Sequence, residues 1–157
     1  MSFFELDLQT GKGVEQEVLE IIQKKYPLAF GIEGNCKAYD LFVPEISAGV
    51  EVKADSMSHE TGNVFIEISL GEKPSGLMVT LATYWAYVTR DEVIWLKPER
   101  IKDCIVQTNP TMQTYVGGNG FAQGDATVKE AYLLKRNTIL QYAERVSQRD
   151  TQVACIL

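Results

Sequence analysis

One short stretch, residues 39–53 (YDLFVPEISAGVEVK), constrains the fold of this 157-residue chain more than any other. Two apolar runs flank residues 44–49, a segment rich in turn-forming residues, and this pattern predicts a β-hairpin. Side chains two residues apart share one face of a strand, so Glu51 and Lys53 point one way while Val52 points the other. We therefore expect a carboxylate and an ammonium group side by side.

The hairpin also predicts a site. Pairing of residues 36–43 with the second strand brings Asp40 to within a few ångströms of Glu51. Two converging carboxylates are what a hard cation such as Mg²⁺ requires, with waters and a substrate phosphate completing its shell. Lys53 then stands beside the metal, placed to orient or deprotonate a water and to offset charge on a phosphoryl transition state. This is the chemistry of phosphodiester hydrolysis.

Asp40, a gap of ten residues and then the triplet Glu51-Val52-Lys53 resemble the motif of the PD-(D/E)xK nuclease superfamily. The superfamily includes restriction endonucleases and the archaeal and phage Holliday-junction resolvases. Tyr39 stands where the motif usually has proline. The resemblance covers about residues 12–89 and implies a Mg²⁺ site, with Mn²⁺ as a substitute, held by Asp40, Glu51 and the Val52 carbonyl.

The first helix of the superfamily often supplies a further glutamate to the metal. Residues 14–26 have helical spacing of apolar positions, with acids expected in the first turns, lysines in the last and Pro27 at the end. The run Lys12-Gly13-Val14-Glu15-Gln16-Glu17 resembles the resolvase arrangement, which puts Glu17 in the ligand position. Otherwise Glu15 and Glu17 are acids that stabilise the helix dipole, and the sequence leaves both interpretations open.

Length and composition indicate one globular domain, residues 1–157, because 45% of the residues are hydrophobic and 23% are charged. We expect a cytoplasmic protein, since no apolar run reaches the length of a membrane span and the N-terminus has no secretion signal. The resemblance implies a bacterial or phage-infected host cell. Three scattered cysteines predict free thiols. The net charge of −6 predicts weak DNA binding without metal and a steep dependence on salt.

The remaining chain alternates strand and helix patterns. We expect a polar loop over residues 55–63, a short helix over 77–83 capped by Ser75, and a terminal helix over 138–147. A helix over 98–106 begins at a proline. The expected strands cover residues 64–70, 84–89, 92–97 and 130–134, the last at a sheet edge.

The sequence leaves the roles of three features open. Glu67 is an auxiliary acid near the metal or a structural partner for a helix, and His59 is a loop residue, a phosphate contact or a proton carrier. The glycine-rich residues 115–125 predict a mobile loop, and closure of the 117–125 segment over a branched or single-stranded substrate is one hypothesis for it.

These patterns predict an α/β fold, a mixed β-sheet flanked by helices. The resemblance to the nuclease superfamily implies that this sheet is restriction-endonuclease-like, with an αβββαβ core. The function expected from the resemblance is a Mg²⁺-dependent DNA endonuclease that acts on branched or otherwise structured DNA in recombination, repair or phage DNA processing. Its catalytic residues would be Lys53, Asp40, Glu51 and Glu17, and cutting two strands would favour a homodimer. The rivals are a non-catalytic interaction or assembly module on the same fold, and an exonuclease or nuclease subunit of a larger complex.

Overall fold

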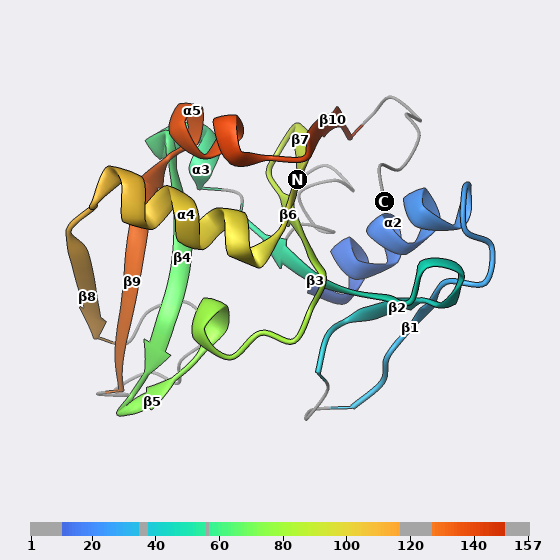
Figure 1. Ribbon diagram of the computed structural model, residues 1–157, viewed down its shortest axis with the longest axis horizontal. Coiled ribbons are helices and arrows are strands. Elements are labelled where there is room, and N and C mark those ends of the chain that lie inside the picture. Colours follow the sequence, from blue (N-terminus) through green and yellow to red (C-terminus); the bar gives the residue numbers. More distant parts are fainter. Residues whose placement is uncertain (1–10, 35–37, 56, 117–126, 150–157) are drawn as a thin grey trace.

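A computed structural model describes residues 11–34, 38–55, 57–116 and 127–149. These residues form two β-sheets with helices packed around them (Figure 1). The first sheet has the spatial order β1 (Phe30–Gly31), β2 (Leu41–Val43), β3 (Ala48–Ala54), β6 (Tyr84–Val88), β7 (Glu92–Leu96) and β10 (Arg145–Gln148). The second has the order β5 (Lys73–Pro74), β4 (Asn63–Leu70), β9 (Val128–Lys135) and β8 (Met112–Val116). The protein is therefore a mixed α/β fold.

Two longer helices and several single turns connect the strands. The longer helices are α2 (Gly11–Gln23) and α4 (Pro98–Thr108), which begins at its proline as predicted. The short elements are α3 (Ser58–Thr61), α5 (Arg136–Ile139) and the 3₁₀ turns η1 (Pro44–Ile46), η2 (Gly76–Met78) and η3 (Leu140–Tyr142). Within the described part of the chain, no helix is both long and apolar enough to cross a membrane.

The predicted hairpin is confirmed, but its first strand covers Leu41–Val43 and not residues 38–40, while residues 36–37 of the predicted strand lie outside the described residues. Strand β2 pairs antiparallel with β3, and Leu41 lies opposite Val50 in the register. The reversal between them is η1, followed by Ser47 in the left-handed conformation at φ 50°. On its other side β3 pairs with β6 in the parallel sense, so β3 lies inside the sheet with hydrogen-bonded neighbours at both edges.

Helix α2 covers one face of the first sheet. Its buried side chains Val14, Val18 and Ile22 pack against a cluster that contains Val50 and Trp95. The predicted helix is confirmed, but it begins at Gly11 and ends at Gln23. Its glutamates therefore stand in the middle turns and the lysines beyond its end, so the expected arrangement of charges at the two ends is wrong.

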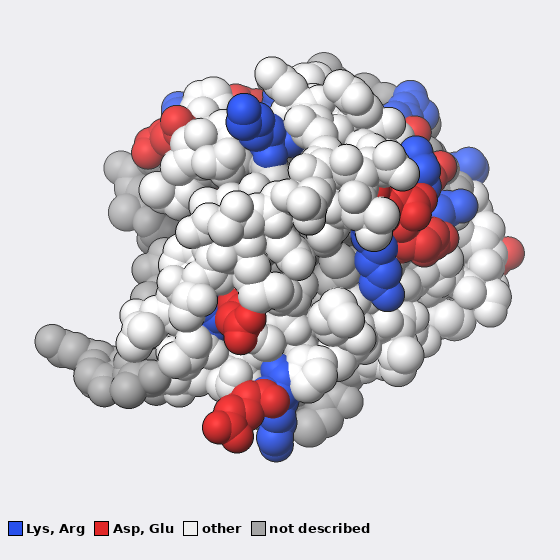
Figure 2. All heavy atoms as spheres, turned by 60° about the vertical axis from the view of Figure 1, so that its left-hand side comes forward, with Lys and Arg blue, Asp and Glu red and all other residues white. Residues whose placement is uncertain are grey.

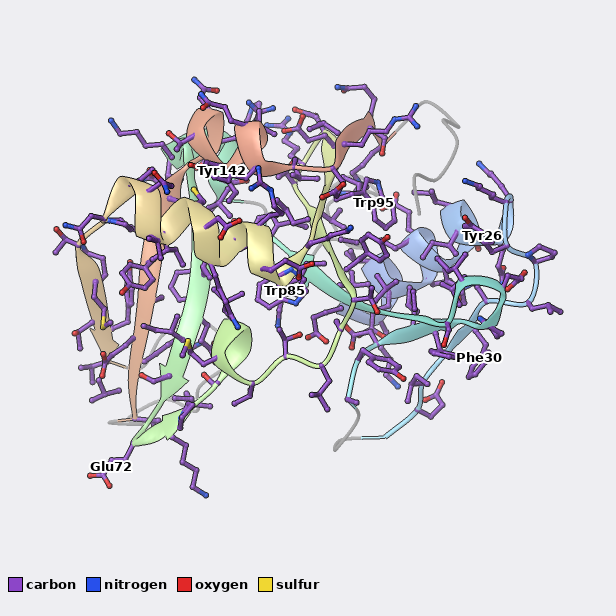
Figure 3. All side chains as sticks on the ribbon, viewed as in Figure 1. Tyr26, Phe30, Glu72, Trp85, Trp95 and Tyr142 are labelled. Atoms are coloured by element: carbon purple, nitrogen blue, oxygen red, sulfur yellow. The ribbon has the colours of Figure 1, made fainter. Side chains whose placement is uncertain are left out.

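The other face of the first sheet packs against the second sheet and α4. Trp85, Ile94 and Leu96 from β6 and β7 join Ile66 of β4 and Ile101 of α4 in one buried cluster. Figure 3 shows the two tryptophans on opposite sides of the first sheet, Trp95 toward α2 and Trp85 toward α4 and η2. Cys104 of α4 is a buried free thiol, as predicted.

The crossover between β3 and β6 differs from the prediction. Residues 64–70 form a strand as expected, but this strand β4 pairs with β9 in the second sheet and does not lie beside β3. The one-turn helix α3 interrupts the predicted loop at 55–63. Strand β9 lies between β4 and β8, so the prediction of an edge strand over 130–134 is wrong.

The helix predicted over residues 77–83 is also wrong, because only the single turn η2 forms there. The Ser75 hydroxyl donates to Glu67 Oε1 at 2.6 Å instead of capping a helix. Gly76 has φ +53°, and a Cβ at this position would come within 2.2 Å of the Glu67 carbonyl oxygen. Residues 75–78 therefore pack closely against β4 and do not form the predicted helix.

The chain after β9 departs from its helical pattern. Residues 136–142 form α5 and η3, and residues 145–148 then extend as β10 along the edge of β7. The side chain of Ser147 accepts a hydrogen bond from Trp95 Nε1 at 3.2 Å. Pairing with an open strand edge outweighs the helical spacing of Ile139, Leu140 and Val146. Tyr115 and Val116 end strand β8, and the rest of the glycine-rich segment lies outside the described residues.

Tyr87 ties the two sheets together. Its buried hydroxyl donates to the Asp55 carboxylate and accepts from the backbone N–H of Phe65 on β4 at 3.1 Å. Burial first, and then the negative charge of Asp55, raise the pKa of Tyr87 well above the usual 10.0. The neutral phenol is therefore the form that the fold holds.

We expect Tyr87→Phe to lower the free energy of unfolding near pH 7 by about 1–3 kcal/mol, because two half-buried polar groups, the Asp55 carboxylate and the Phe65 N–H, lose their partner. The contribution of Tyr87 is fully present below pH 10.0, the pKa of an ordinary tyrosine, and is lost as pH rises toward the raised folded-state pKa. Urea denaturation of both proteins between pH 7 and pH 11 tests this. The difference between them should shrink above pH 10, and a constant difference would contradict the assignment.

Candidate functional site

The site begins with Asp40, the residue directly before β2. Its backbone N–H donates to the Val50 carbonyl at 3.0 Å, and its Oδ2 accepts from the Val52 N–H at 2.7 Å. The carboxylate thus takes the place of a backbone carbonyl and extends the β2–β3 ladder past its last regular pair. Only 6% of Asp40 is exposed. Its carboxylate is therefore fixed against the middle of the Glu51-Val52-Lys53 triplet.

Glu51 and Lys53 point to the face of the first sheet that meets the second sheet. In the parallel register Glu51 lies beside Trp85 and Lys53 beside Tyr87, and both aromatic residues belong to the cluster between the sheets. Lys53 Nζ is 3.0 Å from Glu51 Oε1. The expected pairing of carboxylate and ammonium is confirmed. The two side chains are 23% and 38% exposed, so a phosphate or a water has access to both.

The Val52 carbonyl belongs to the same edge as Asp40. The N–H and C=O of one strand residue point to the same side of the strand. The Val52 N–H points to Asp40, so its carbonyl also points toward the β2 side and away from β6. A carboxylate and a carbonyl oxygen are thus directed to one side of β3, next to the Glu51 side chain.

Tyr39 packs against the hairpin and fixes the approach to Asp40. Its ring stacks on Phe42, with centroids 5.9 Å apart, and it lies directly over Gly49. A Cβ on Gly49 would come within 2.3 Å of the Tyr39 ring, so only glycine leaves room for it. The tyrosine that stands in place of the motif's proline is therefore a packing residue at the start of β2.

The structure does not bring Glu17 to this group. Glu17 Oε2 is 2.7 Å from Arg149 Nη2, and Arg149 Nη1 donates to the Thr89 carbonyl at 3.0 Å. The Arg149 side chain is only 3% exposed. Helix α2 covers the face of the first sheet opposite to Glu51 and Lys53, which places Glu17 beside the β6–β7 turn. Its partner follows β10 and had no signal in the sequence.

The structure also places the two residues whose role the sequence left open. Glu67 is a structural partner, since it accepts from Ser75 and its Oε2 is 3.3 Å from Lys129 Nζ. Ser75 directly precedes the 3₁₀ turn η2, and Lys129 belongs to β9. His59 lies on α3, exposed, with Nδ1 3.3 Å from Asp91 Oδ2.

A cleft opens between the two sheets next to Lys53. Its volume is about 570 Å³, and its walls include Lys53, Asp55 and Tyr87 from the first-sheet side. Asp55 Oδ1 also accepts from two N–H groups at the start of α3, at 2.8 and 3.0 Å. The sequence analysis missed Asp55 as a site residue, although it continues the alternation of Glu51 and Lys53 by two more residues.

The atoms at this edge of β3 that could bind a metal are oxygens, the ligand type that a hard divalent cation prefers. Asp40 and Glu51 supply carboxylate oxygens, the Val52 carbonyl points to the same edge, and waters and a phosphate would complete an octahedral shell. Across residues 11–34, 38–55, 57–116 and 127–149, no three Asp, Glu, His or Cys side chains are grouped to hold a metal ion. Within these ranges the acids that β3 and the residue before β2 contribute are Glu51 and Asp40. Comparison of the chain with protein-family models, with curated proteins and with solved structures finds no match.

Two substitutions of Asp40 test whether its hydrogen bond to the Val52 N–H stabilises the fold. We expect Asp40→Ala to lower the free energy of unfolding by about 1–3 kcal/mol, because the Val52 N–H loses its acceptor. Asp40→Asn keeps a side-chain oxygen that can accept this hydrogen bond, so its free energy of unfolding should fall clearly less. Urea denaturation measures both variants.

The matched control is Glu45→Ala, which removes an exposed carboxylate acceptor from the Leu28 N–H and should cost less than Asp40→Ala. Equal destabilisation by Asp40→Asn and Asp40→Ala would show that the hydrogen bond does not hold the hairpin end.

Proposed function

We propose that this chain is a divalent-metal-dependent deoxyribonuclease of the PD-(D/E)xK kind. The observation that carries the proposal is the contact of Asp40 with the middle of the triplet, 2.7 Å from its oxygen to the Val52 N–H, beside the Glu51–Lys53 pair at 3.0 Å. One acid at the start of one strand, and an acid and a lysine on its hairpin partner, are the motif's elements.

The topology around the site supports the same proposal. Helix α2 comes first, β1, β2 and β3 then pair in succession, and after a crossover β6 pairs parallel to β3. The superfamily core has the same order of a helix, three strands and a returning fourth strand. One difference remains, because the described crossover residues carry α3, β4, β5 and η2 where the core has a helix. The second sheet and α4 cover the face that such a helix would cover.

The chain's own residues have distinct roles in hydrolysis. Asp40 and Glu51 would hold Mg²⁺ or Mn²⁺, which when bound supplies charge neutralisation at the phosphate and a more acidic water. The Lys53 ammonium donates hydrogen bonds to the attacking water and to a phosphate oxygen, which offsets the added negative charge of the transition state. The water oxygen bonds to phosphorus and gives up one proton to solvent, one P–O ester bond breaks, and the leaving oxygen takes up a proton from solvent.

Glu17 has no role in the proposed site. Its carboxylate neutralises the buried Arg149, and α2 lies on the opposite face of the sheet from Glu51. We assign Glu17 to stability, because its carboxylate contacts a buried guanidinium, and loss of such a contact is destabilising.

The distribution of charge favours substrate selection by DNA structure rather than by strong general attraction. The net charge is −6, and Figure 2 shows basic side chains beside acidic ones, separated by broad uncharged areas. DNA binding should therefore be weak without metal. A single site per chain would favour a homodimer for cutting both strands of a branched DNA. Branched DNA in recombination, repair or phage replication is the substrate class we favour.

Cleavage assays with Mg²⁺ or Mn²⁺ on branched, single-stranded and linear duplex DNA test this function. We expect wild-type protein to cut at least one substrate, while Lys53→Ala, Asp40→Asn and Glu51→Gln lower the rate by at least about 100-fold, since each removes a metal ligand or the charge that stabilises the transition state. Chelation of the metal should stop the reaction. Persistent cleavage in Lys53→Ala and Asp40→Asn would reject the site, and a wild type inactive on every substrate would favour an interaction module.

Glu17→Gln tests independently whether Glu17 belongs to the proposed metal site. We expect this variant to unfold at lower urea concentration than wild type, because the buried Arg149 loses the negative charge of Glu17 at 2.7 Å. Cleavage per folded molecule should stay within about threefold of wild type, since a group that touches neither metal nor substrate has little differential effect on the transition state. A loss as large as that of Glu51→Gln would return Glu17 to the metal site.

A further inference from the structure

The cleft between the two sheets has the chemistry of a pocket for an unpaired nucleobase. Its volume of about 570 Å³ lies within the range of about 300–1,000 Å³ that small-ligand pockets have. Phe65 of β4 and Tyr115 of β8 line it, half-buried, with their ring centroids 5.4 Å apart at an interplanar angle of 64°. Part of each ring is thus open to a group that enters the cleft.

Positive charge accompanies these aromatic rings. Lys129 Nζ lies 5.7 Å from the centroid of the Phe65 ring, and Lys53 lines the same cleft from the first sheet. Glu67 and Glu51, which pair with these lysines, are not among the residues that line the cleft. Asp55 does line it, and its carboxylate accepts hydrogen bonds from Tyr87 and from two backbone N–H groups. Aromatic faces for stacking and lysines for phosphates are the two components of single-strand nucleic acid binding.

The position of the cleft decides between possible occupants. Lys53 belongs both to the proposed catalytic triplet and to the cleft wall, so a molecule in the cleft lies next to the phosphate that Lys53 would contact. In duplex DNA a base is covered by its neighbours on both faces and cannot stack on a protein ring. A nucleotide that is already unpaired, at a junction, flap or bulge, can stack on the protein rings without the energetic cost of unpairing.

We propose that the cleft lined by Phe65, Tyr115 and Lys129 binds one unpaired DNA nucleotide beside the scissile phosphate, and that this contact selects branched or single-stranded substrates. The inference rests on the proposed nuclease function, which it deepens by naming the structural feature of DNA that the enzyme recognises. Asn63, also in the wall, supplies an amide that can hydrogen-bond the edge of the bound base.

The experiment uses the full chain and a single-stranded DNA oligonucleotide with one central 2-aminopurine, at low salt without added metal. Stacking on the aromatic wall should quench its fluorescence, and the same oligonucleotide annealed to its complement should show no such quenching. Tyr115→Ala should weaken binding about tenfold or more, the loss expected for one stacking contact. Tyr115→Phe, which keeps the ring, and Phe30→Ala, an exposed aromatic on β1 outside the cleft, should bind as wild type does.

The outcomes separate this inference from the proposed function. Tyr115-dependent quenching without cleavage of any DNA would leave the cleft assignment standing and reject the nuclease. Equal cleavage of paired and unpaired DNA by wild type and Tyr115→Ala would support the nuclease and overturn the cleft assignment. Unchanged affinity of a folded Tyr115→Ala, checked by circular dichroism, would overturn it as well.

Discussion

The alternation of side chains along β3 organises the structure. Strand β3 is hydrogen-bonded to β2 on one edge and to β6 on the other, so its position in the sheet is fixed from both sides. Val50 and Val52 then face α2, while Glu51 and Lys53 face the second sheet. A shift of the register by one residue would bury the two charged groups under α2 and expose the valines. The core therefore fixes the orientation of the polar pair.

Asp40 shows how one group can serve the fold and the proposed chemistry. Its carboxylate completes the hydrogen bonding of a strand that would otherwise have an unsatisfied N–H at Val52. A carboxylate held by a backbone donor and largely buried has little freedom to rotate away. Any cation bound at this edge thus meets an oxygen that is already placed, and little further ordering of this group is required on binding.

The sequence predicted those parts of the structure that depend on neighbours along the chain. The hairpin, its turn and the Glu51–Lys53 pair follow from alternation and turn residues within fifteen positions, and all three are present. Predictions that depend on distant pairing were wrong. Residues 138–147 have helical spacing, but the open edge of β7 recruits residues 145–148 as a strand. The pairing of β4 with β9 likewise could not be predicted from nearby residues, since the alternation of apolar and polar residues predicts a strand but not its partner.

The same distinction applies to Glu17, because its interpretation as a metal ligand depends on contacts between residues that are distant in the sequence. Its spacing from Lys12 and Gly13 fits the resolvase pattern, but the side of the sheet that α2 covers is decided by Val14, Val18 and Ile22, which pack on the valine face of β3. Arg149, more than 130 positions later in the chain, then provides the counter-charge for Glu17. On the opposite face, Tyr87 links Asp55 to β4 and so holds the second sheet beside Lys53. The wall of the cleft and the proposed catalytic residues are therefore parts of one hydrogen-bonded unit, and the second sheet supplies the surface that we propose for binding an unpaired nucleotide.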